Sequence, residues 1–159
     1  MKNILYTIIL SFLFSFSVFA DWESTKDAYN TGDYETALRE IKPLAEQGYA
    51  AAQFIIARMY EKGEGVTQDY KEALKWYRLA AEQGYAAAQS NLGVLYASGE
   101  GVIQDVVIAD MWFNIAASNG YEDAKTNRDI AESNMTSEQI TKAQELAREC
   151  QRKNFIDCG

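Results

Sequence analysis

The sequence predicts an all-α fold, a solenoid of stacked antiparallel helical hairpins. The main observation is an internal repeat of 36 residues. Residues 50–85, "AAAQFIIARMYEKGEGVTQDYKEALKWYRLAAEQGY", align without a gap with residues 86–121, "AAAQSNLGVLYASGEGVIQDVVIADMWFNIAASNGY", and 17 of the 36 positions are identical. Such self-similarity at a fixed period indicates a repeat architecture, in which each unit packs mainly on its neighbours.

The spacing of apolar residues predicts two helices in each repeat. The second helix of the first repeat has its apolar residues at i, i+3, i+4 and i+7, and these residues are Ala73, Trp76, Tyr77 and Ala80. This spacing places them on one helical face. A single hairpin cannot bury such a face alone, so we expect the hairpins to stack.

The turn "GEGV" separates the two helices and begins at Gly63 and again at Gly99. Glycine-rich loops that bind phosphate follow a strand and open a helix. Because helices are predicted on both sides of "GEGV", we interpret it as the turn of the repeat. Asp69 and Asp105 follow the two turns and are suited to be N-caps of the second helices.

The repeat extends upstream, since residues 33–49 align with residues 69–85. We therefore assign residues 21–49 to an N-terminal partial repeat. Pro43 occupies the position of Leu79 in the next unit. A proline inside a helix costs about 3 kcal/mol, and the sequence predicts a kink or split there.

After the second repeat the identity fades, and we expect a degenerate hairpin and capping helix over residues 122–153. Thr136 is a predicted N-cap with Gln139 as its capping-box partner. The last helix carries a single apolar stripe formed by Ile140, Ala143, Leu146, Ala147 and Cys150. A helix that is apolar on one side is suited to close the end of a solenoid, and residues 154–159 form a tail.

Residues 1–20, "MKNILYTIILSFLFSFSVFA", are typical of a secretory signal peptide. Lys2 precedes an apolar run that ends in small residues, and the run is shorter than the roughly 20 residues that a membrane span needs. We expect cleavage after Ala20 and a periplasmic or secreted chain with no stable membrane insertion. An uncleaved membrane anchor is the alternative.

The chain from Asp21 onward carries 14 basic and 23 acidic residues, a net charge of −9. This balance disfavours nucleic acid, which proteins bind by neutralising phosphates with Lys and Arg. Two cysteines, Cys150 and Cys158, lie in the tail region and can form a disulfide in an oxidising compartment. Two free thiols are the alternative.

The string "AQSNLGVLYASGEGVIQD", followed by "A..WF..AA..G", resembles the Sel-one-like repeat, a tetratricopeptide-related helical hairpin. The resemblance covers two full repeats and a preceding half repeat, and the ending "MTSEQITKAQELARE" resembles the capping helix of small bacterial members. It implies a right-handed α-solenoid of about two and a half repeats that serves as a protein-interaction scaffold. Unlike the cysteine-rich secreted members, these repeats contain no cysteine.

No catalytic chemistry is evident in the sequence. The chain contains no histidine, which excludes histidine-dependent triads and imidazole metal ligands. Glu64 and Glu100 occupy equivalent turns, where we expect them to be solvated and one repeat apart. We therefore predict a protein that is not an enzyme and that has no metal or cofactor, and a small hydrolase is disfavoured.

Positions on the first helices that differ between the repeats are the candidates for partner binding, because in tetratricopeptide-like solenoids these helices line the concave face. They are Phe54, Ile55 and Arg58, with their equivalents Ser90, Asn91 and Val94. A partly apolar groove with one arginine suits a peptide or a helix. The alternative is that Phe54 and Ile55 pack on the preceding hairpin. Trp22 is a further aromatic candidate, or it covers the N-terminal end.

Together these features predict an exported adaptor that binds a partner protein or peptide. A module that binds cell-wall peptidoglycan or glycan is the alternative, since such ligands favour aromatic platforms.

Overall fold

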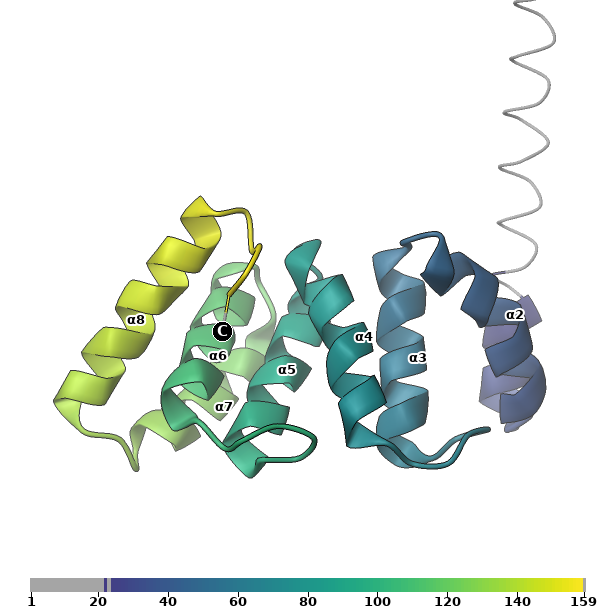
Figure 1. Ribbon diagram of the computed structural model, residues 1–159, viewed down its shortest axis with the longest axis horizontal. Helices are drawn as coiled ribbons and strands as arrows, with labels where there is room; N and C mark the ends of the chain where they lie inside the picture. The colour runs from purple at the N-terminus through teal and green to yellow at the C-terminus, as the bar shows by residue number, and fades with distance from the viewer. Residues whose placement is uncertain (1–21, 23, 159) are drawn as a thin grey trace, which may run out of the picture.

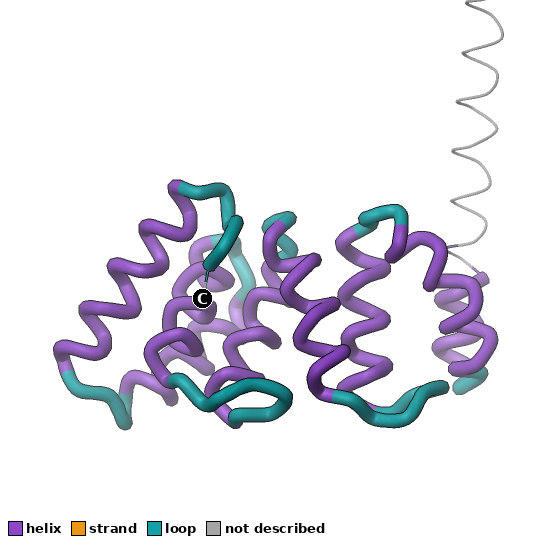
Figure 2. The backbone as a smooth tube through the Cα atoms, in the orientation of Figure 1, coloured by secondary structure: helices purple, strands orange, loops and turns teal. Residues whose placement is uncertain are grey.

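The computed structural model describes residue 22 and residues 24–158 (Figure 1), so the predicted signal peptide lies outside the described residues. A short helix over residues 24–31 comes first. Seven further helices follow: α2 (Tyr34–Glu46), α3 (Ala50–Lys62), α4 (Tyr70–Glu82), α5 (Ala86–Ser98), α6 (Val106–Ser118), α7 (Glu122–Glu132) and α8 (Ser137–Arg152). Helices joined by turns account for this whole part of the chain, as Figure 2 shows, and the all-α prediction is confirmed.

The helices pair into antiparallel hairpins that stack along the long axis of the molecule (Figure 1). The helix over residues 24–31 pairs with α2, so the N-terminal unit contains two helices. The two 36-residue repeats form the hairpins α3–α4 and α5–α6, and α7 and α8 complete the stack. Within the described residues, no helix has the length and apolar character that crossing a bilayer requires.

The core lies between successive hairpins. Its largest fully buried side chains include Trp112 and Tyr77, each 0% exposed, and alanines such as Ala73 and Ala109 are equally buried. The small residues allow close approach, and the large rings fill the remaining space. On the face that the sequence periodicity predicted, Ala73, Tyr77 and Ala80 are buried, and Trp76 is half-buried.

The predicted N-caps are confirmed. The Asp69 carboxylate accepts hydrogen bonds from the backbone N–H groups of Lys71 (2.9 Å) and Glu72 (3.2 Å) at the start of α4. Asp105 does the same at the start of α6. The backbone N–H of Asp69 itself donates to the carbonyl of Tyr60 (2.9 Å).

The "GEGV" turn rests on the preceding hairpin. Gly101 has a φ of +73°, and a Cβ atom at this position would lie 2.5 Å from the carbonyl oxygen of Tyr70 at the start of α4. A Cβ atom at Gly65 would likewise lie 2.7 Å from the carbonyl oxygen of Tyr34 at the start of α2. The glycines are therefore required by contact between repeats. Glu64 accepts a hydrogen bond from the Tyr29 hydroxyl, and Glu100 accepts one from Ser98.

Buried glutamines connect the hairpins. The side-chain amide of Gln89 is 0% exposed, donates to the carbonyl of Ala81 (3.1 Å), and accepts a bond from Asn119 (2.8 Å). Gln53 and Gln83 repeat this arrangement one unit earlier. Each buried amide thus satisfies a helix-terminal carbonyl of the preceding hairpin, which explains why glutamine recurs at this position.

Pro43 does not split α2, which runs unbroken from Tyr34 to Glu46. The predicted split is therefore wrong, because Pro43 lies in the last turns of the helix and is exposed. Proline lacks a single backbone N–H, so only one hydrogen bond of the helix is lost there. A bend of the continuous helix at Pro43 stays a prediction.

The C-terminal end is closed by α8, which packs on α6. Its capping box is present, with Thr136 and Gln139 each bonded to the other's backbone N–H. After α8 the chain turns back (Figure 1), and a disulfide joins Cys150 to Cys158. This returning segment places the Phe155 ring beside Gly84, at the end of α4.

Candidate functional site

A cavity of about 260 Å³ lies between the N-terminal helix and α3. Its walls include Trp22, Tyr29, Phe54, Ile55, Arg58 and Tyr85. The first two belong to the N-terminal helical segment, the next three to α3, and Tyr85 directly precedes α5. The cavity, which we call the first-helix pocket, is therefore formed by the first helices of three successive hairpins.

An aromatic cluster fixes one wall of the pocket. The Phe54 ring lies 5.1 Å from the Tyr85 ring and 5.8 Å from the Tyr77 ring, both in tilted geometry. Tilted aromatic pairs at these distances are favourable. Because Tyr77 is fully buried, Phe54 has a packed anchor on one side and contributes to the pocket on the other.

Arg58 gives the pocket a positive charge. Its guanidinium carbon lies 5.9 Å from the centre of the Phe54 ring, within the range of a cation–π contact. Among residues 22 and 24–158, Arg58 forms no ion pair with a carboxylate. The guanidinium therefore keeps its hydrogen-bonding capacity for another acceptor.

The carboxylates of the same hairpin are engaged by tyrosines. Glu61 accepts a short hydrogen bond from the Tyr77 hydroxyl, and Glu64 accepts one of 2.6 Å from the Tyr29 hydroxyl. Burial and the bond to Glu64 raise the pKa of Tyr29 to about 12. Burial and the bond to Glu61 also raise the pKa of Tyr77. Both phenols stay protonated and hold the two carboxylates at neutral pH.

The three candidates from the first repeat line one pocket, whereas their equivalents do not. Ser90 is buried, with 1% of its surface exposed, and has no surface to offer a partner. Asn91 donates to the Tyr77 hydroxyl (2.9 Å). Val94 is 37% exposed but lies outside the pocket. Phe54 also packs against the core cluster that runs from α3 to the C-terminal tail, and Ile55 packs against the cluster between α2 and α3. Each side chain therefore both lines the pocket and packs on its neighbours.

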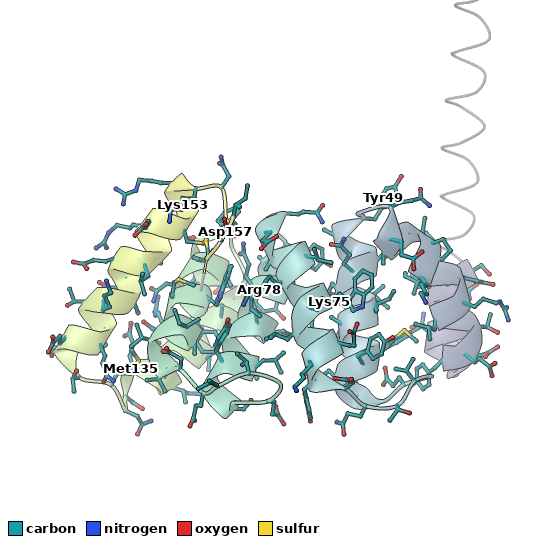
Figure 3. All side chains as sticks on the ribbon, viewed as in Figure 1. Tyr49, Lys75, Arg78, Met135, Lys153 and Asp157 are labelled. Carbon is teal, nitrogen blue, oxygen red and sulfur yellow. A yellow bond between two sulfur atoms is a disulfide. The ribbon has the colours of Figure 1, made fainter. Side chains whose placement is uncertain are left out.

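Sequence reasoning did not find Tyr29 and Tyr85. Tyr85 was excluded because the repeat has tyrosine there each time, at Tyr49 and Tyr121. Figure 3 shows Tyr49 on the outer turn between α2 and α3, where it is 44% exposed. The repeated tyrosine thus has different surroundings in each unit. Tyr85 could be identified as a pocket residue only from the residues that lie around it in the folded chain.

The family model of the Sel1 repeat matches residues 50–85 and 86–121. Two solved structures are similar to the chain. One is a protective antigen of uropathogenic Escherichia coli strains that displays an SLR fold, with 30% identity, a TM-score of 0.79 and coverage of 86% of this chain. The other is a Sel1 repeat protein from Oxalobacter formigenes, with 35% identity, a TM-score of 0.63 and coverage of 66% of this chain.

This chain spans 31% of the length of the Escherichia coli protein and 43% of the length of the Oxalobacter protein. No curated protein matches the sequence.

Proposed function

The chain belongs to the Sel1 repeat proteins, which generally serve as protein-interaction scaffolds, and we propose that it is an exported adaptor that binds one partner protein through its concave helical face. The first-helix pocket is the place where the partner docks. No part of this proposal involves catalysis.

The observation that carries the proposal is the composition of this pocket. One cavity is bordered by four aromatic side chains, Ile55 and an arginine that forms no ion pair within the described part of the chain. Aromatic residues and arginine are enriched among the residues that dominate binding energy at protein interfaces. A cavity of about 260 Å³ lies just below the range of small-molecule sites, roughly 300–1,000 Å³, and suits a single side chain of a partner.

Export is tested by the mass of the protein recovered from the bacterial envelope. We expect a chain that begins at Asp21, because the apolar segment before it ends in small residues and is shorter than a membrane span. Intact mass spectrometry of the protein from the envelope and culture fractions checks this. Recovery of the full-length chain in the cytoplasm alone contradicts the exported part of the proposal.

Partner docking is tested with a photoreactive amino acid at Ile55, in the pocket wall. We expect crosslinking to one partner protein in the exported fraction. The same probe at Ile103, which is 88% exposed in the turn before α6, serves as the control and should give no such product. An Arg58→Glu change should reduce the Ile55 product at least tenfold, because it reverses the charge at the pocket.

Arg39→Glu is the matched control, since Arg39 is an exposed arginine of α2 outside the pocket. It should leave the crosslinked product unchanged. Retention of the protein on purified cell wall, together with no protein crosslink at Ile55, would instead assign a glycan or peptidoglycan ligand. Equal loss with both arginine variants would show that net charge, and not the pocket, controls binding.

A further inference from the structure

The structure of the first-helix pocket specifies the chemistry of its occupant. We infer that it binds the C-terminal residue of a partner polypeptide, with an apolar side chain in the cavity and the free α-carboxylate on Arg58. This inference rests on the proposed adaptor function and deepens it.

The two carboxylates that follow Arg58 in its own hairpin make hydrogen bonds to tyrosines and form no ion pair with Arg58. The chain has 23 acidic and 15 basic residues, so an arginine near carboxylates would ordinarily pair with one. Glu61 lies one helical turn beyond Arg58, yet it accepts the hydroxyl of Tyr77. Glu64 accepts the hydroxyl of Tyr29 and lies 3.8 Å from Lys62. Glu61 and Glu64 are thus engaged elsewhere, and Arg58 can receive a carboxylate from a ligand.

The second repeat lacks this arrangement. At the positions of Arg58, Glu61 and Tyr77 it has Val94, Ala97 and Phe113. All three polar groups of the first repeat are therefore replaced by apolar ones. Repeat packing alone does not require the arginine or its surrounding hydrogen bonds, because the second hairpin packs without them.

The size of the cavity favours one residue over a longer segment. About 260 Å³ accommodates one large apolar side chain between the rings of Trp22, Phe54 and Tyr85. In a C-terminal residue the carboxylate is bonded to the Cα that bears this side chain, so both groups reach one pocket together. An acidic side chain would need a second residue.

Arginine binds a carboxylate with charge-assisted hydrogen bonds, which are stronger than neutral ones. Partial enclosure by aromatic rings reduces solvent screening around the guanidinium. The apolar wall and the Arg58 guanidinium should therefore both stabilise the binding of one ligand. A ligand that has both groups should bind better than a ligand that has either one.

The test uses small probes and the full-length protein. N-acetyl-L-phenylalanine has an aromatic side chain and a free α-carboxylate, and N-acetyl-L-phenylalaninamide differs only by the loss of that charge. We expect the acid to bind at least fivefold more tightly than the amide at pH 7, as measured by NMR titration. The affected signals should be those of Trp22, Phe54 and Arg58.

Arg58→Gln should bring the two probes within twofold of each other, and Arg58→Lys should retain part of the preference. Arg39→Gln, the matched control, should leave the ratio unchanged. Circular dichroism of each variant verifies that the helices are intact. Raising the salt concentration should reduce the preference for the acid, since it screens the interaction between the carboxylate and Arg58.

The outcomes separate this inference from the proposed function. Equal binding of acid and amide to the wild-type protein overturns the carboxylate assignment, while crosslinking at Ile55 would still support docking. A dipeptide with the carboxylate in its side chain, acetyl-Asp-Phe-amide, overturns the C-terminal assignment if it binds more tightly than N-acetyl-L-phenylalanine. Absence of binding by any probe overturns the inference as a whole.

Discussion

Replacing Gly101 by alanine is expected to destabilise the protein by about 2–5 kcal/mol. The backbone at Gly101 has a φ of +73°, a left-handed conformation that costs a residue with a Cβ atom about 1–2 kcal/mol. The new Cβ would also lie 2.5 Å from the carbonyl oxygen of Tyr70 and 2.9 Å from the amide nitrogen of Lys71. Because both are backbone atoms at the start of α4, they cannot rotate away, and overpacking of this kind adds about 1–3 kcal/mol.

Gly120→Ala separates the two contributions. Gly120 has a φ of +87°, but no atom lies within 4 Å of the position of its Cβ. This control should cost only the backbone term of about 1–2 kcal/mol. The difference between the two variants then measures the contact between one repeat's turn and the preceding hairpin.

Urea denaturation monitored by circular dichroism measures both variants. Similar losses of unfolding free energy for Gly101→Ala and Gly120→Ala would contradict the close contact with Tyr70. A selective loss in Gly101→Ala would establish that the second glycine of "GEGV" serves the stacking of hairpins.

Asp110 should make the protein less stable as the pH rises. Its side chain is 0% exposed, and one carboxylate oxygen has no hydrogen-bond partner, whereas the other accepts a bond of 3.0 Å from Asn114. Burial, together with the negative charge of Glu132, raises the pKa of Asp110 to about 6 against the opposing effects of Arg128 and the Asn114 hydrogen bond. The equivalent position in the preceding repeat is Leu74.

The direction of this pH dependence follows from the number of protons that the folded and unfolded states bind. In the unfolded chain Asp110 loses its proton near its ordinary pKa of about 3.9, whereas in the folded protein it keeps the proton until about pH 6. Between these values the folded state binds more protons, so the free energy of unfolding falls with rising pH. A shift of about two units corresponds to about 3 kcal/mol, and the full loss is reached above pH 6.

Asp110→Asn should therefore be more stable than the wild type by about 2–3 kcal/mol at pH 7.5 and similar to it at pH 3.5. Thermal or urea unfolding across this range measures the difference between the two proteins. Asp27→Asn, at an exposed position of the N-terminal helix, should show no comparable change. A constant difference between Asp110→Asn and the wild type at every pH would mean that Asp110 does not titrate in the folded protein within this window.

Much of the fold could be predicted from the chain because the repeat presents each local signal twice. The apolar periodicity, the capping residues Asp69 and Asp105 and the box at Thr136 are local features that nearby backbone groups satisfy directly. The split predicted at Pro43 was the main error. The cost of a proline depends on its position along the helix, and near an exposed end that cost is small.

The candidate site was predictable only in its α3 part. Phe54, Ile55 and Arg58 were found as departures from the repeat, and they do line one pocket. Tyr85 was missed because it obeys the repeat, and Ser90 was included although the packing of α7 against α5 buries it. A departure from the repeat identifies a position that differs between the two hairpins, but whether its side chain is exposed depends on the neighbouring hairpin.

By itself, then, the sequence determined the helices, their caps, the turns and the order in which the hairpins stack, because these depend on residues close together in the chain. The tertiary structure decided which side chains share a pocket and which carboxylates are already engaged. Tyr29 meets Glu64 and Tyr77 meets Glu61 only after separate helices pack together. The charge left on Arg58 is thus a property of the stacked hairpins, since it depends on contacts between helices that no local pattern encodes.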